Sequence, residues 1–67
     1  MLNLYINDNE YQQHSEAIHL LADQYHINEP FVREVYEKIL KDLSHKAKFR
    51  KYLIVLVARQ VKEFLRK

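Results

Sequence analysis

Four histidines are the residues of this chain best suited to hold a metal or to move a proton near neutral pH. His14 and His19 lie five positions apart, so a helix does not align them as it aligns the i, i+4 pair of a zinc-binding helix. Because the chain has no cysteine, a metal site would need His45 or carboxylates recruited by the fold. We therefore expect no metal site, and we expect His14, His19, His26 and His45 to be exposed or to cap helices.

Residues for covalent or acid–base catalysis are equally sparse. The two serines, Ser15 and Ser44, both lie outside a nucleophile-elbow context. The carboxylates Glu34 and Glu37 are expected on an exposed helix surface, where no burial raises the pKa of a carboxyl group toward neutrality. The chain also has no glycine, which excludes P-loops and Rossmann turns. We therefore predict a protein that is not an enzyme, with no catalytic residue and no cofactor.

Cations offer a different chemistry, the binding of phosphate. Arg59, Lys62 and Arg66 lie at i, i+3 and i+7, so they share one face of a helix, and more cations cluster at positions 46, 48, 50 and 51. Such a stripe can follow a nucleic-acid backbone without reading its sequence. The alternative, which we favour, is that these charges solvate the rim of an apolar helix and neutralise the acidic first part of the same or a neighbouring chain.

Charge is unevenly distributed along the chain. Residues 1–27 carry four carboxylates and no Lys or Arg, whereas residues 45–67 carry eight Lys or Arg and one carboxylate. The net charge is nevertheless only +2. The chain is therefore acidic at its start and basic at its end.

The length of 67 residues, with 48% hydrophobic and 30% charged residues, indicates one small globular domain. Such a domain buries only about 60% of the surface that its unfolded chain exposes. Without disulfides, helix packing or self-association must reinforce the core. No signal peptide is evident, and the longest apolar stretch, residues 52–58, is far shorter than the about 20 residues of a membrane span. We expect a cytoplasmic protein that does not contact membranes.

Apolar periodicity and capping residues predict two helices in the first part of the chain. Asn28 and Pro30 mark a helix start, because asparagine is favoured at the N-cap and proline is tolerated in the first turn. Apolar residues then recur every three or four positions, which predicts a helix over about residues 29–43. This stripe consists of Val32, Val35, Ile39 and Leu43, widened by Tyr36 and Leu40. A similar stripe predicts a helix over about residues 9–25, and its competing caps are Asn7, Asp8 and Asn9.

A third, long helix is predicted from Ser44, as its cap, to the C-terminus. Its apolar residues spill from a main face onto a flank formed by Ile54, Ala58 and Leu65. The main face consists of Phe49, Leu53, Leu56, Val57, Val61 and Phe64. Two short helices do not cover a stripe this wide, so we expect a second subunit to bury the flank in a homodimer. The β-branched residues at 52–58 also allow a strand, but the flanking helical patterns and the lack of turn residues argue against it.

Residues 1–7 are expected to form a short N-terminal arm. Leu2, Leu4 and Ile6 alternate with their neighbours at the period of a strand. We favour an arm that packs loosely on the helices. The alternative is a strand that pairs with a second chain, as in ribbon-helix-helix dimers.

Residues 18–38 follow the apolar pattern of a helix-turn-helix. His26 lies in the turn, where the motif usually has glycine, and a positive φ is less favourable for histidine than for glycine. The part of the second helix that would enter a major groove is acidic, so we do not favour base reading. Arg33 is the best candidate for a base contact. The apolar positions of the pattern are Leu21, Ala22, Tyr25, Ile27, Val32 and Val35.

Two short segments carry a resemblance to a known family. They are V-x-x-V-Y-E at residues 32–37 and R-x-V-x-x-x-L-R at residues 59–66. Residues 17–66 as a whole resemble a family of short bacterial proteins, mostly proteobacterial, that is catalogued as a domain of unknown function. The resemblance implies a bacterial cytoplasmic protein, and it supplies no activity and no functional residue. Further matched positions are Leu21, Ala22, Leu40, Leu43, Ala47, Tyr52, Leu53, Val55 and Leu56.

These observations predict an all-α fold. Residues 8–67 are expected to form a three-helix bundle with a helix-turn-helix-like pair and a long C-terminal helix, preceded by the arm at residues 1–7. The expected function is that of a small non-enzymatic interaction module that self-associates through its C-terminal helix. Another protein is a second candidate partner. The alternative function is a small nucleic-acid-binding regulator, and its contact residues would be Arg33, Arg59, Lys62 and Arg66.

Overall fold

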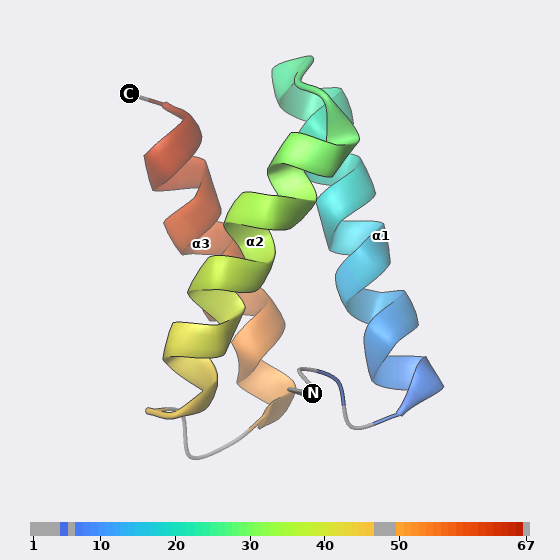
Figure 1. The fold of residues 1–67 in the computed structure, drawn as a ribbon, viewed down its shortest axis with the longest axis vertical. Coiled ribbons are helices and arrows are strands. Elements are labelled where there is room, and N and C mark those ends of the chain that lie inside the picture. The colour runs from blue at the N-terminus through green and yellow to red at the C-terminus, as the bar shows by residue number, and fades with distance from the viewer. Residues whose placement is uncertain (1–4, 6, 47–49, 67) are drawn as a thin grey trace.

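Three helices pack against one another in the computed structural model, which describes residues 5, 7–46 and 50–66 (Figure 1). The chain runs up through the first helix, down through the second and up through the third. No strand is present among the residues described. The predicted all-α, three-helix fold is therefore confirmed. The elements are α1 at Asp8–Tyr25, α2 at Glu29–Ser44, a short 3-10 helix η1 at Arg50–Tyr52, and α3 at Leu53–Leu65.

Helix α1 begins at a side-chain cap. Oδ1 of Asn7 accepts a hydrogen bond from the backbone N–H of Glu10 at 2.9 Å, and the backbone of Asn7 is extended. Asp8 and Glu10 also place negative charge in the first turn, where the helix dipole favours it. Of the three competing caps, Asn7 is the one used, so the helix begins one residue before the predicted start.

His26 makes the turn between α1 and α2 in the left-handed conformation, with φ 54° and ψ 45°. The backbone N–H groups of His26 and Ile27 donate to the carbonyl oxygens of Asp23 and Ala22 at 3.3 and 3.0 Å. This is the Schellman pattern, which satisfies the last carbonyls of a helix and usually places glycine at the left-handed position. A histidine thus occupies, with a positive φ, the turn position where the helix-turn-helix motif usually has glycine.

The start of α2 agrees with the prediction from Asn28 and Pro30. Helix α2 begins at Glu29, with Pro30 in its first turn and Asn28 at the N-cap. The backbone carbonyl of Asn28 accepts hydrogen bonds from the N–H groups of Phe31 and Val32 at 3.1 Å each. The side chain of Asn28 makes no capping hydrogen bond, so this residue contributes through its backbone rather than through its amide.

The core lies where the three helices meet. Each helix contributes residues spaced three or four positions apart, which is the spacing that keeps side chains on one face. Burying one such aliphatic side chain stabilises the fold by roughly 1.5–3 kcal/mol. The core residues are Ile18, Leu21, Ala22, Val32, Tyr36, Leu40, Leu53, Val57 and Val61.

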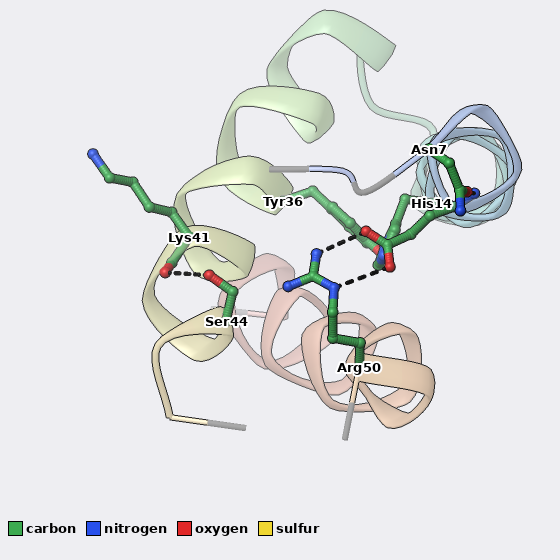
Figure 2. A network of polar contacts seen from close by, with 7 residues as sticks. Asn7, His14, Tyr36, Lys41, Ser44 and Arg50 are labelled. Carbon is green, nitrogen blue, oxygen red and sulfur yellow. Dashed lines mark hydrogen bonds and ion pairs between the residues drawn. The ribbon is translucent and has the colours of Figure 1, made fainter. Parts of the chain in front are cut away.

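The third helix differs from its predicted extent. Ser44 ends α2 instead of capping α3, and its Oγ donates to the carbonyl of Lys41 at 2.9 Å (Figure 2). Helix α3 begins at Leu53, after η1, and its 13 residues make it shorter than α1 and α2. The cations at positions 46, 48, 50 and 51 explain the late start, because they would have faced the positive end of a helix begun at Ser44.

Two residues of the predicted main face of the third helix are exposed. Leu56 is 40% exposed and Phe64 is 51% exposed, whereas Leu53, Val57 and Val61 are fully buried. The three buried residues follow one another at i, i+4 spacing along a single line of the helix, and Leu56 falls beside that line. Phe49, which was also assigned to this face, lies outside the described residues.

The arm is described at Tyr5 and Asn7. The hydroxyl of Tyr5 donates to Oε2 of Glu37 at 2.9 Å, and its ring lies 5.0 Å from the ring of Tyr11. Tyr5 thus packs on both α1 and α2. Residues 2, 4 and 6, which carry the period of a strand, lie outside the described part of the chain.

Candidate functional site

A histidine and a tyrosine form a polar contact inside the bundle. His14 is fully buried, and its Nδ1 lies 2.5 Å from the hydroxyl oxygen of Tyr36. The expectation that all four histidines are exposed or capping is wrong for His14. The reason is its register, because His14, Ile18 and Ala22 follow one another at i, i+4 spacing along the buried stripe of α1.

Burial keeps this pair uncharged. It lowers the pKa of His14, an effect that the Glu10 carboxylate opposes and the Arg50 guanidinium reinforces. Burial also raises the pKa of the Tyr36 hydroxyl far above neutrality. Nε2 of His14 is buried and makes no hydrogen bond within the described part of the chain. The pair joins α1 to α2 as two neutral groups.

The other three histidines are exposed. Nδ1 of His19 lies 3.0 Å from Oε1 of Glu29, and this hydrogen bond raises the pKa of His19. His26 occupies the turn after α1, and His45 follows the last residue of α2. Among the described residues, no group of three or more His, Asp or Glu side chains is placed to hold a metal ion.

One cation of the basic C-terminal part is bound by the acidic first helix. Nη2 and Nε of Arg50 donate to the two carboxylate oxygens of Glu10 at 2.7 and 3.2 Å (Figure 2). The Glu10 side chain is only 15% exposed and that of Arg50 is 33% exposed. For Arg50, the favoured interpretation of the basic residues as partners of the acidic first helix is therefore confirmed within one chain.

Arg33, the candidate base-contacting residue, is held against α1. Its Nη2 donates to Oγ of Ser15 at 3.3 Å, and its guanidinium lies 5.6 Å from the ring centre of Tyr11. Its Nη1 also lies 3.7 Å from a carboxylate oxygen of Glu37, one turn further along α2. These contacts place Arg33 on the side of α2 that faces α1.

The basic stripe of α3 does form a single face. Arg59, Lys62 and Arg66 are exposed and line one shallow hollow, whose other lining residues are Val55, Ala58 and the exposed carboxylate Glu63. The spacing of the three cations therefore places them together, as predicted. Within the described part of the chain, no ion pair involves any of the three.

An apolar hollow lies between α2 and α3. It has a volume of about 240 Å³, and its floor is formed by the half-buried Val35 and Ile39. Two aromatic rings from different helices border it, Phe31 at 46% exposure and Phe64 at 51% exposure. The remaining lining residues are Glu34 and Lys38. We call this surface the α2–α3 hollow.

The flank that was expected to form a dimer seam is partly covered by the chain itself. Ile54, Ala58 and Leu65 are half-buried, and Leu65 packs against the core. Among the apolar residues of α3, Val55 at 60% exposure and Phe64 are the more accessible ones. The accessible apolar surface of α3 thus lies mainly outside the flank.

A further hollow follows the outer side of α1. It has a volume of about 460 Å³ and contains one large apolar side chain, Leu20, which is 65% exposed. Its other lining residues are Gln12, Ser15, Glu16 and His19. A single leucine among polar residues is common on protein surfaces and carries no functional argument.

Comparison with known protein families assigns the chain to one of them. A family model described as protein of unknown function (DUF3562) matches residues 11–67. The chain belongs to this family. The DUF3562 match spans all three helices, and it confirms the expected resemblance to a domain of unknown function. No curated protein and no solved structure gives a significant match. None of the helices in the described part of the DUF3562 chain has the length and apolar character needed to cross a membrane.

Two rings border the α2–α3 hollow, and the sequence did not predict the exposure of either one, for two different reasons. Phe31 precedes the predicted stripe of the second helix and was not assigned to any surface, although a phenylalanine outside the stripe was a usable signal. Phe64 was assigned to the buried face, because helical spacing does not show that the last turn of α3 leaves its ring half exposed. Tertiary packing decides both outcomes.

Proposed function

We propose that this protein is a small non-enzymatic interaction module that forms a homodimer through the surface shared by α2 and the C-terminal helix α3. The observation that carries this proposal is the pair of half-exposed rings, Phe31 and Phe64, that border the α2–α3 hollow. The sequence placed the expected dimer seam at the flank of Ile54, Ala58 and Leu65, and we propose instead that it lies at this hollow.

Aromatic side chains contribute strongly to association because each can bury 150–250 Å² and few rotamers are lost. Monomeric proteins usually expose large apolar residues singly. Here two rings from different helices border one concave apolar surface, which is more typical of an interaction site. A domain of this size also gains from a partner, since its own core is small and no disulfide reinforces it. The lack of cysteine supports a reducing compartment, and we include a bacterial cytoplasmic location in the proposal.

Sedimentation equilibrium over a wide concentration range tests the proposal. We expect the wild-type chain to dimerise and Phe64→Ser to be monomeric. Leu20→Ser is the control, because it removes an even more exposed apolar side chain, 65% against 51% for Phe64, from the outer side of α1. Ala58→Glu tests the flank. A wild-type mass that stays monomeric at every concentration overturns the proposal, and dissociation by Ala58→Glu but not by Phe64→Ser returns the seam to the flank.

A second candidate function is the binding of a nucleic-acid backbone by the basic face of α3. The observation that favours it is the shared hollow of Arg59, Lys62 and Arg66, which span seven positions or about 10 Å of helix. Three phosphate contacts would give a slope of roughly −2.7 in log K against log salt on duplex DNA. Arg33 is not included, because Ser15 and Glu37 already bind its guanidinium.

Fluorescence anisotropy with a short DNA duplex at low salt tests this second function. Neutralising the face with Arg59→Gln, Lys62→Gln and Arg66→Gln together should abolish binding. The control, Lys38→Gln with Lys41→Gln, removes two cations from the exposed side of α2 and should retain most of the binding. The absence of binding by the wild-type chain at low salt, or binding that does not depend on salt, rules this function out.

A further inference from the structure

Two residues of opposite charge border the α2–α3 hollow on either side of the midpoint of α2. Glu34 lies in the N-terminal half of the helix and Lys38 lies in the C-terminal half, and both are exposed. The other exposed charges of α2 do not border the hollow, since Glu29 contacts His19 of α1 and Asp42 contacts Lys46. A surface divided in this way is complementary to a second copy of itself turned end to end.

Glu34 and Lys38 are also available for a partner. They are separated by four positions, and other oppositely charged residues at this spacing do pair in this chain. Arg33 lies 3.7 Å from Glu37, and Lys46 lies 3.4 Å from Asp42. In the residues that the structure describes, no ion pair involves Glu34 or Lys38.

We infer that the occupant of this surface is a second copy of the chain whose α2 runs antiparallel to the first, with Glu34 of each copy facing Lys38 of the other. This inference rests on the proposed dimer and specifies its geometry. A two-fold axis perpendicular to α2 and level with position 36, midway between these two residues, generates both pairs at once. Val35 and the α2–α3 hollow of each copy then lie at the seam.

The charges reject the other two-fold arrangement. If the two α2 helices ran parallel, each residue would face its own copy, so that Glu34 would oppose Glu34 and Lys38 would oppose Lys38. Like charges placed opposite each other disfavour association, and flanking charges commonly set the orientation of paired helices. The antiparallel arrangement replaces two repulsions with two attractions.

Charge reversal of one residue at a time tests the geometry by sedimentation equilibrium. Glu34→Lys alone and Lys38→Glu alone each place like charges in both pairs, and we expect each to weaken the dimer by roughly tenfold or more. The combined Glu34→Lys and Lys38→Glu variant exchanges the signs and should restore dimerisation. Mixing the two single variants should give a heterodimer in which both pairs are attractive again.

Controls separate this inference from the proposed function. Glu16→Lys makes the same change in net charge on exposed α1 and should leave the dimer intact. Circular dichroism checks that each variant keeps its helices. A wild-type dimer that Phe64→Ser dissociates but that both single reversals leave unchanged overturns the antiparallel geometry alone, and so does a combined variant that fails to regain affinity. A wild-type monomer overturns the dimer itself.

Discussion

At the scale of single residues, His26 adopts a conformation that favours glycine. Its φ of 54° brings the Cβ atom close to the following backbone, a contact that costs L-residues roughly 1–2 kcal/mol. The turn persists because the N–H groups of His26 and Ile27 satisfy carbonyl oxygens at the end of α1. The chain therefore accepts local strain in order to end one helix and begin the next.

Replacing His26 with glycine should stabilise the protein. We expect His26→Gly to raise the free energy of unfolding by about 0.5–1 kcal/mol, because the strain is removed and part of the gain is offset by the larger backbone freedom of unfolded glycine. His26→Val should have the opposite effect, since a β-branched residue is disfavoured at positive φ. Urea unfolding followed by circular dichroism measures both, and a destabilised glycine variant would show that the imidazole itself supports the turn.

His14 makes stability depend on pH. Burial lowers the pKa of His14 in the folded state, so between that value and about 6.5 the unfolded chain binds more protons than the folded one. The contribution of His14 to the free energy of unfolding is thus fully present above pH 6.5, and it is lost as the pH falls from there toward the lowered pKa of the folded state. We expect the urea midpoint to decrease from pH 7 toward pH 5, and His14→Phe to have a flatter profile in this range.

His19 contributes with the opposite sign. Its pKa is raised by Glu29, so its stabilisation is present below pH 6.5 and is lost as the pH rises. The pH profiles of the wild-type chain and of His14→Phe are therefore best compared with His19→Ala added to both, so that the titration of His19 does not contribute. NMR titration of the His14 ring gives a direct check, and a midpoint at or above 6.5 would contradict the assigned burial effect.

The burial of His14 was not predictable from its residue type. Histidine is intermediate in burial preference, and the sequence reading considered it only as a metal ligand or an exposed group. The stripe of α1 that contains Ile18 and Ala22 extends one turn upstream to position 14, so the register was a usable signal. Its partner, Tyr36, lies 22 positions away, and such a long-range pairing is not encoded in local periodicity.

At the scale of elements, the pair of Glu10 and Arg50 ties the start of α1 to η1. A bidentate, partly buried pair contributes more than an exposed one, because both donors are fixed and screening is weaker. A double-mutant cycle with Glu10→Gln and Arg50→Gln should give a coupling energy of about 1 kcal/mol. The exposed pair of Asp42 and Lys46 is the control, and its cycle should give less than about 0.5 kcal/mol.

This cycle also tests the interpretation of the charge distribution. If the coupling of Glu10 to Arg50 is no larger than that of Asp42 to Lys46, then the acidic first helix does not gain measurable stability from the basic part of the chain. The coupling energy isolates the pair better than the effect of either single substitution, because replacing Glu10 also removes a negative charge from the first turn of α1.

Element boundaries were predictable where a local signal defined them. Proline and asparagine placed the start of α2 correctly, and the apolar pattern on either side of His26 placed the turn there without predicting its left-handed conformation. The start of α3 was wrong, because Ser44 resembles a cap but its hydroxyl is bound by Lys41. The competing effect was electrostatic, since the cations that follow Ser44 disfavour a helix start there.

At the scale of the whole molecule, dimerisation should appear in thermal stability. A chain that associates only when folded is stabilised by mass action. For two chains of 67 residues, a tenfold rise in protein concentration should raise the unfolding midpoint by roughly 5 °C. Differential scanning calorimetry measures this shift. Phe64→Ser should remove it, and a wild-type midpoint that does not change with concentration would be inconsistent with a dimer.

The surfaces of the molecule were only partly predictable from the sequence. The spacing of Arg59, Lys62 and Arg66 was enough to place them on one face, because they share a helix. The α2–α3 hollow combines Phe31 and Phe64, which are 33 positions apart and on different helices. A sequence shows which residues are apolar, but the packing of α2 on α3 decides which of them remain accessible.

The short turn at His26 also has a consequence for how the chain folds. Only three residues separate α1 from α2, so little chain entropy is lost when these helices meet, whereas α3 begins nine positions after α2 ends. We expect the first two helices to associate before α3 docks. The turn is then already formed in the transition state for folding, so His26→Gly is expected to accelerate folding more than it slows unfolding.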